Sequence, residues 1–362
     1  DGAVLRIGRT SLDLSRARKI WVIGAGKAAA PMGRAVEKIL GGRLSGGLLV
    51  TKYGHALPLR KLEVLEAAHP LPDANGLAAA ERIRSLARDG IGPDDLVLCL
   101  LSGGASALLV SPAGDVTLED KLECTRLLLR AGTGIYEMNA VRKHLSDLKG
   151  GGLARLLAPA RVAALVLSDV VGDDLATIAS GPLAPDPTTY GECLEICRRL
   201  GILDRVPRAV RRRFERGAAG QIGETPKAGD AVFRGVVSRI VGSNAQACTA
   251  AAQAARRLGY HACVLTSRLE GDTGEAARFH MNVAAEIAAE GRPLRRPACV
   301  LSGGETTVRV TGSGKGGRNQ EFTLHCVRAL AAMPAPCLVA SLGTDGTDGP
   351  TDAAGALADN TT

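Results

Sequence analysis

Short apolar runs alternate along the chain with longer segments in which apolar and charged residues recur at helical spacing. The apolar runs are strand-sized and lie at Ile20–Ile23, Leu48–Thr51, Leu96–Leu101, Val162–Leu167, Arg239–Val241, Cys263–Thr266, Cys299–Leu301 and Cys337–Ser341. The segments with helical spacing lie at Ala28–Leu40, Asn75–Ala87, Leu118–Ala131, Glu192–Leu200, Ala245–Leu258 and Gly274–Glu290. Such alternation is typical of βαβ units, so the pattern predicts an α/β fold with mainly parallel sheets.

The length of 362 residues exceeds what one ordinary core holds, so we expect two α/β domains. Arg216–Asp230 lacks periodicity and carries turn residues, which predicts a linker at 216–230. The predicted N-terminal domain is then 1–215 and the C-terminal domain 231–362. Because the chain begins at Asp1 and stops just past a glycine-rich motif, we expect both ends to be cut from a longer protein and the second domain to be truncated.

Four short motifs of the first half recur in the second half in the same order. The pairs are Ile23–Gly26 with Val241–Asn244, Leu101–Ala105 with Leu301–Glu305, Lys149–Gly152 with Lys315–Arg318, and Ser168–Asp173 with Thr344–Gly349. The spacings between motifs differ in the two halves. The order indicates either an old duplication or two domains that present similar loops.

Composition narrows the function classes. The net charge of +8 is spread along the chain and aromatic residues make up 2%, which argues against nucleic-acid binding because stacking side chains are missing. The longest apolar runs are too short to cross a bilayer, so no membrane partner is expected. Nine cysteines without a C-x-x-C pair are typical of buried thiols in a reducing compartment, which predicts a cytoplasmic protein.

The segment Gly24–Ala29 joins a predicted strand to a predicted helix and matches the start of a dinucleotide fingerprint. The next predicted strand ends at Thr51 and Lys52, where that fingerprint requires an acidic residue for the ribose, so NAD binding is disfavoured. Lys27 lies in the first helical turn, where a cation opposes the helix dipole. We therefore expect Lys27 to neutralise a phosphoryl or carboxylate group.

The segment Ser102–Ser106 follows a strand with small residues only. Its backbone N–H groups and two hydroxyls could surround a phosphate or a carboxylate, whereas a purely structural turn would need one glycine.

The glycine-rich segment Gly312–Glu321 resembles a Walker phosphate-binding loop but fails its pattern. Arg309 stands where the first glycine belongs, and Gly316 replaces the Ser or Thr that would hold Mg²⁺. What remains is a basic loop that opens onto a helix. Arg318 could contact a carboxylate or phosphate through two nitrogens, and Asn319 could bind either group.

Acidic turns follow two strongly apolar strands, at Ser168–Asp174 and Gly343–Asp352. Carboxylates there could hold Mg²⁺ or accept the proton of an attacking hydroxyl, although Asp-Gly pairs are also common in plain reverse turns. The second turn lacks the glutamate of a calcium loop.

The sequence has neither a G-x-S-x-G nor an H-E-x-x-H motif, and its six histidines show no partner pattern, so His69 and His144 are expected to be structural. Anion-binding turns, basic residues and metal-suited carboxylates together favour phosphoryl transfer, which depends on positioning and charge neutralisation.

Taken together, these motifs resemble the type 2 glycerate kinases, also called glycerate 2-kinases, whose C-terminal part is the MOFRL domain. The resemblance covers nearly the whole chain. It rests on Gly24–Ala28, His69–Asp73, Leu101–Leu108, Asn139–Ser146, Lys149–Leu153, Leu167–Asp173, Ala179–Pro182, Gly303–Glu305, Gly314–Glu321 and Gly343–Gly346.

The resemblance implies two Rossmann-like α/β domains with an interdomain cleft, in which ATP and Mg²⁺ are used to phosphorylate D-glycerate to 2-phosphoglycerate. It assigns catalytic roles to Lys27, Asp169, Arg318 and Asp345, and metal binding to Asp169 and Asp173. The expected substrate- and nucleotide-binding residues are Gly24, Gly26, Ser102, Gly103, Gly104, Ser106, Asn244, Glu305, Lys315 and Asn319.

Two alternative functions stay open on the sequence alone. One is an NAD(P)H-dependent hydroxypyruvate reductase, a label that older annotations of this family carry. The other is a non-catalytic binding protein for small organic acids. The sequence also leaves open whether the protein forms a homodimer.

Overall fold

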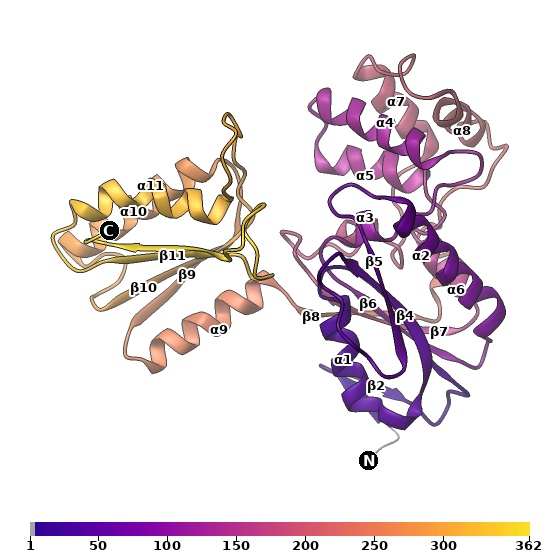
Figure 1. Cartoon of the computed structure of the whole chain (residues 1–362), viewed down its shortest axis with the longest axis horizontal. Coiled ribbons are helices and arrows are strands. Elements are labelled where there is room, and N and C mark those ends of the chain that lie inside the picture. Colours follow the sequence, from indigo (N-terminus) through magenta and orange to yellow (C-terminus); the bar gives the residue numbers. More distant parts are fainter. Residues whose placement is uncertain (1–3) are drawn as a thin grey trace. The chain divides into compact units, whose positions relative to one another are not determined.

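The computed structural model describes residues 4–362 and divides into two compact units, Asp1–Val241 and Gly242–Thr362. The segment 216–230 lies within the first unit. There the Thr225 hydroxyl donates to Asp186 and the Asp186 N–H donates to the Pro226 carbonyl. The chain order of the elements is shown in Figure 1. In the described part of the chain, no helix has the length and apolar character that crossing a membrane requires.

The first unit is built on a six-stranded sheet with the strand order β5-β4-β3-β6-β7-β8. The strands are β3 (Ile20–Ala25), β4 (Leu44–Lys52), β5 (Leu62–Ala67), β6 (Leu96–Leu101), β7 (Arg161–Leu167) and β8 (Val236–Gly242). Neighbouring strands from β5 to β7 run parallel. A separate antiparallel hairpin is formed by β1 (Val4–Ile7) and β2 (Thr10–Asp13). The predicted parallel α/β architecture is confirmed.

Helices cover both faces of this sheet. The helices of the first unit are α1 (Ala29–Leu40), α2 (Ala74–Ser85), α3 (Ala105–Leu108), α4 (Leu118–Arg130), α5 (Ile135–His144), α6 (Gly152–Leu157), α7 (Tyr190–Arg199) and α8 (Arg208–Ala218). Short single turns are η1 (Gly41–Arg43), η2 (Leu86–Gly90), η3 (Ile178–Ser180) and η4 (Ala231–Phe233).

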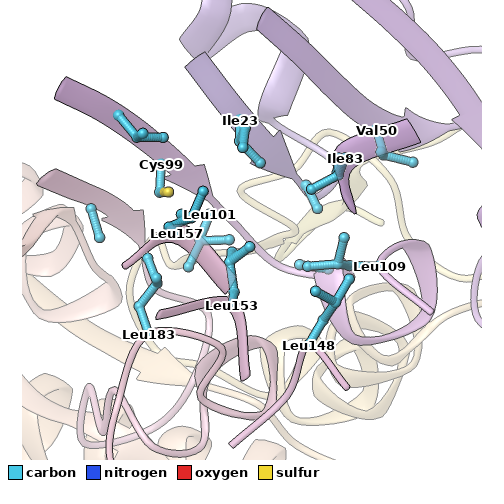
Figure 2. Packing of buried hydrophobic residues seen from close by; sticks show 14 of the residues in the cluster. Ile23, Val50, Ile83, Cys99, Leu101, Leu109, Leu148, Leu153, Leu157 and Leu183 are labelled. Carbon is cyan, nitrogen blue, oxygen red and sulfur yellow. The ribbon is translucent and has the colours of Figure 1, made fainter. Parts of the chain in front are cut away.

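Strand β6 is buried on both faces of the sheet. Its alternate residues Leu96, Leu98 and Leu100 pack with α1 on one face of the sheet, and Cys99 and Leu101 pack on the other face. Figure 2 shows this second face, where side chains of β6 meet those of α6. A strand buried on both faces needs a continuous apolar run, and this is the pattern that made β6 predictable.

Helices α4, α5, α7 and α8 gather into a bundle beside the sheet (Figure 1) with a core of their own. Tyr190 and Phe214 are its largest buried side chains. Capping boxes at Thr117 with Asp120 and at Thr189 with Glu192 start α4 and α7. Because a capping box satisfies two N–H groups that the helix leaves unpaired, it fixes where each helix begins.

The second unit contains α9 (Asn244–Arg257), β9 (His261–Leu269), α10 (Thr273–Glu290), β10 (Ala298–Gly304), α11 (Arg318–Ala331), β11 (Leu338–Leu342) and β12 (Gly355–Asp359). Strands β9 and β10 pair in parallel, and β11 and β12 pair antiparallel. Its core is small and lies where α10 and α11 meet β12, around Met281, Cys326 and Leu330. All nine cysteines of the chain are free thiols.

The expected strands and helices agree with the structure to within a few residues, but the expected set was incomplete. Strand β5 was missed because Glu63 and Glu66 interrupt its apolar residues. Helix α5 was missed because its buried face includes polar residues such as Asn139 and Lys143, which the apolar pattern does not register.

Candidate active site

The turns that follow β3 and β6 lie against each other, because these parallel strands are neighbours and end at the same edge of the sheet. The Lys27 N–H donates to the Gly103 carbonyl at 2.9 Å, and the Ala28 N–H donates to the Ser102 hydroxyl at 3.0 Å. Gly26 has a φ of 133°, and a Cβ there would overlap the Ser102 hydroxyl. Ser102 is therefore an internal link between the two turns and is only 1% exposed.

Gly24 has a different role from Gly26. It lies inside β3, where a Cβ would approach the Leu100 carbonyl oxygen to 2.7 Å. The structure thus accounts for Gly24 through close packing of two strands. The sequence pattern alone could not separate this packing role from contact with a ligand.

Two charged side chains flank the glycine pair that follows β6. A Cβ at Gly103 would overlap the Asp169 carboxylate, and a Cβ at Gly104 would lie 3.4 Å from Lys27 Cγ. The His69 ring is also adjacent, 3.0 Å from the same position on Gly104. Glycines at 103 and 104 leave the space that these side chains occupy. Lys27 and Asp169, which come from different turns, are thereby brought to one loop.

The Gly103 and Gly104 N–H groups are the donors of this loop. Neither donates to a protein acceptor within the described residues, whereas the Ser102 N–H is taken by the Ala25 carbonyl. Gly104 has a φ of 85°, and consecutive amides in such a conformation can converge on an anion. The loop has the chemistry expected of a phosphate or carboxylate site.

Ser106 lies partly buried on α3. Its hydroxyl lies 2.8 Å from the Ser180 hydroxyl, which donates to Asn139 Oδ1 at 3.2 Å. Ser180 and its neighbour Ala179 both have positive φ values, of 60° and 55°. Such backbone is unfavourable for residues with a side chain, so the surrounding structure must hold it in place.

Lys149 binds the backbone of α3, the helix that carries Ser106. Its ammonium group donates to the Ser106 carbonyl at 2.7 Å and is 3.4 Å from that of Leu109, and the residue is 3% exposed. Burial, together with the charges of Lys121 and Arg142, holds the pKa of Lys149 well below its ordinary value. The motif Lys149–Gly152, noted in the sequence as a repeat, therefore contributes a buried cation.

The end of α5 is anchored by a buried polar network. Lys143 pairs with Asp186 at 3.3 Å, and His144 Nε2 lies 3.1 Å from a Glu224 carboxylate oxygen. Burial alone would raise the pKa of Glu224, but hydrogen bonds from His144 and the Tyr190 N–H lower it to about 2. His144 is structural, as expected.

The second unit brings together a second set of predicted residues. Arg318 at the start of α11 pairs with Glu305 at 2.8 Å. The Asn244 side chain donates to the Ser267 carbonyl at 2.9 Å and fills the space where a Cβ on Gly303 would lie. Lys315 is exposed in the glycine-rich loop.

The N-terminus of α11 is occupied by Asp348, which the sequence did not single out. Its carboxylate is 2% exposed and accepts hydrogen bonds from the backbone and side chains of Asn319 and Gln320. Asn319 also accepts from the Ser341 hydroxyl. Asn319, predicted to bind a ligand, thus donates hydrogen bonds to the carboxylate of Asp348. The only indication of this contact in the sequence was the acidic turn that contains Asp348.

The remaining predicted carboxylates lie on turns. Asp345 is exposed and accepts from the Thr347 N–H at 3.2 Å. Asp173, with a φ of 59°, lies on the same loop as Asp169. Across residues 4–362, no cluster of three or more metal-binding side chains occurs. Asp169 and Asp173, two carboxylates of one loop, are nevertheless residue types suited to Mg²⁺ carried by a nucleotide, because that ion uses one or two protein carboxylates together with phosphate oxygens.

Comparison with known proteins places this site in context. The family model described as Domain of unknown function (DUF4147) matches residues 3–215, and that of the MOFRL family matches residues 298–362. The chain is 43% identical to a protein named glycerate 2-kinase from Pyrococcus horikoshii, over 95% of this chain and 76% of that protein. It is 45% identical to an Agrobacterium vitis protein with the provisional name hydroxypyruvate reductase, over 93% of this chain and 74% of that protein.

A crystal structure of glycerate kinase from Thermotoga maritima superposes with a TM-score of 0.85 at 41% identity, covering 95% of this chain and 80% of that chain. Agreement in sequence and in fold extends over both units. The chain therefore belongs to the glycerate kinase family whose members combine a DUF4147 domain with a MOFRL domain.

Proposed function

We propose that this protein is an ATP-dependent kinase that phosphorylates D-glycerate to 2-phosphoglycerate. The observation that carries the proposal is the loop at Gly103 and Gly104, which Lys27 and Asp169 flank at the carboxyl edge of a parallel sheet. Ligands of open α/β sheets bind at this edge. A cation, a carboxylate and two amides without protein acceptors are the parts that phosphoryl transfer needs.

Each residue has a defined role in the proposed reaction. Asp169 takes the proton of the glycerate 2-hydroxyl as the bond from that oxygen to the γ-phosphorus forms and the bond from the γ-phosphorus to the leaving oxygen of ADP breaks. Lys27 and the Gly103 and Gly104 amides neutralise the charge on the transferred group. Arg318 of the second unit supplies a further cation, and the other predicted residues of that unit bind substrate or nucleotide.

We extend the proposal to Mg²⁺, which would be held by Asp169 and Asp173. Bound there, the ion would supply charge neutralisation of the ATP phosphates. The carboxylate of Asp169 has two oxygens, so one can face the metal while the other accepts a proton. A cytoplasmic location and homodimerisation stay predictions.

The reductase alternative has less support. Strand β4 ends at Lys52, without the acidic residue that holds a dinucleotide ribose, and the close approach at Gly26 is to Ser102.

The test is production of ADP that depends on D-glycerate, followed in a coupled assay. NMR of the product distinguishes 2-phosphoglycerate from 3-phosphoglycerate. Asp169→Asn should abolish most of the activity, and Asp89→Asn, at an exposed aspartate of η2, serves as the matched control. Absence of ADP formation with D-glycerate, or oxidation of NADPH with hydroxypyruvate, would overturn the proposal.

A further inference from the structure

Arg142 lies on α5, in the last turn of the helix. It is three positions after Asn139, so the two residues lie on the same face of the helix. Asn139 is linked through the Ser180 hydroxyl to the Ser106 hydroxyl on α3. That chain of hydrogen bonds places this face of α5 next to the helix that follows Gly103 and Gly104.

The guanidinium group of Arg142 has no protein partner in the described chain, although burial lowers its pKa. Two other partly buried or ion-paired arginines of the unit show the contrast: Arg84 lies 2.8 Å from Asp147, and Arg18 lies 3.2 Å from Asp95. A desolvated charge without a counter-ion is unfavourable. The Arg142 nitrogens are not among the fully enclosed polar atoms that lack a partner, and the residue is partly rather than completely buried.

Two buried lysines, Lys149 and Lys121, interact electrostatically with Arg142, and the Asp147 carboxylate also acts on Lys121. Lys149 and Lys121 are 3% and 8% exposed, and their ammonium groups are bound by backbone carbonyls, those of Ser106 and Leu145, with no carboxylate bound to either in the described chain. Both lie within electrostatic reach of Arg142, which contributes to the lowered pKa of each lysine. Three basic side chains therefore lie within electrostatic reach of one another, and an anion bound beside them would favour their charged forms.

We propose that Arg142 binds the carboxylate of the hydroxy-acid substrate and thereby determines acceptor specificity. The inference rests on the proposed kinase function. In glycerate the carboxylate is attached to the carbon that bears the reacting hydroxyl, so its binding residue must lie beside the loop that holds the transferred phosphoryl group. The planar guanidinium fork matches the two oxygens of a carboxylate.

The kinetic test compares Arg142→Gln and Arg142→Lys with Arg130→Gln, an exposed arginine at the end of α4. Arg142→Gln should raise the KM for D-glycerate roughly 10- to 100-fold, since it removes a charge-assisted bidentate pair, and should leave the KM for ATP unchanged. Arg142→Lys should recover part of the loss. Preference for D-glycerate over glycerol, which lacks the carboxylate, should collapse in Arg142→Gln alone.

An unchanged KM for D-glycerate in Arg142→Gln would overturn the inference. A rise confined to the KM for ATP would also overturn it, because the guanidinium would then serve a phosphate. Calorimetric titration of D-glycerate without ATP separates this inference from the kinase proposal. Binding that depends on Arg142 in a protein without kinase activity supports the carboxylate site and refutes the kinase. Normal kinase activity in Arg142→Gln refutes the site alone.

Chemical modification of the protein without any substitution provides a second test, which does not depend on whether a variant folds. Phenylglyoxal reacts with accessible guanidinium groups, and mass spectrometry locates the modified arginines. D-glycerate should slow modification at Arg142 and not at Arg130. Equal rates at Arg142 with and without D-glycerate would contradict the proposal.

Discussion

Leu101–Gly104 in the first unit and Leu301–Gly304 in the second unit carry the same four residues at the ends of the parallel strands β6 and β10. In the first unit β6 ends at Leu101, and the chain turns through Gly104, where φ is 85°, into α3. In the second unit Gly304 still belongs to β10, and the Glu305 N–H donates to the Leu269 carbonyl of β9.

The neighbours of each copy account for the difference. Gly103 is packed by the Asp169 carboxylate, and Gly303 is packed by the Asn244 side chain. Ser102 accepts from the backbone at the start of α1, whereas Ser302 is bonded by His280. The same four residues therefore form a loop flanked by charged side chains, with N–H groups that donate to no protein acceptor among the described residues, in one unit and the extended end of a strand in the other.

The largest expected effect concerns one cation from each unit. Lys27→Ala and Arg318→Ala should each lower kcat by roughly 100- to 1,000-fold, because a preorganised charge at a developing anion contributes about 3–4 kcal/mol. Lys38→Ala and Arg328→Ala, exposed positions on α1 and α11, are the matched controls. A large loss in Lys27→Ala with unchanged kcat in Arg318→Ala would mean that the first unit carries the chemistry alone.

The equivalent glycines Gly103 and Gly303 allow a test of whether the two copies of the motif differ in function. Gly103→Ala would displace the Asp169 carboxylate, the movable end of a side chain, so it should lower kcat with little change in stability. Gly303→Ala would displace Asn244 and its hydrogen bond to Ser267, at about 1 kcal/mol of unfolding free energy. Steady-state kinetics and urea unfolding measure both. Equal losses of kcat with equal stability would remove the distinction.

The motif partners Lys149 and Lys315 should differ in how stability depends on pH. The folded-state pKa of Lys149 lies well below its ordinary value near 10.5. Between those two values the unfolded chain binds a proton that the folded chain does not, so the unfolding free energy rises with pH across this window. Below the window both states are protonated and the full destabilisation remains.

Lys149→Met should flatten that rise, and Lys315→Met, at an exposed position, should leave it unchanged. Lys121, whose pKa burial lowers to about 7, adds a rise of the same sign in both variants. Urea unfolding from neutral to alkaline pH gives the slopes. A slope in Lys149→Met equal to that of the unmodified protein would show that Lys149 binds its proton normally in the folded state.

The smallest expected effect concerns the two serines. Ser102→Ala leaves the Ala28 N–H at the start of α1 without its acceptor, which should cost about 1 kcal/mol of unfolding free energy. Ser302→Ala removes the contact with His280 in a less buried place and should cost less. Thermal unfolding ranks the two variants, and the reverse order would show that the second copy is the more tightly held.

The sequence predicted local structure where burial is complete. Strand β6 was found with its observed bounds, since a run buried on both faces is apolar at every position. Helix α5 and strand β5 were not found, because their polar residues serve contacts with distant segments. Arg142 and Lys149 were visible within motifs, but only burial showed that they are cations without a carboxylate partner.

By itself, the sequence determined the α/β class, the family resemblance and the loops at which charge gathers, because these depend on residue type and spacing along the chain. Only the tertiary structure decided which residues share a site. Lys27 and Asp169 are far apart in sequence and lie beside the same Gly103–Gly104 loop because parallel strands end at a common edge. The tertiary structure also showed that Asp348 binds the N-terminus of α11 and that Gly24 and Gly26 are needed for close packing. These contacts join residues that are distant in sequence, so the spacing of residues along the chain does not predict them.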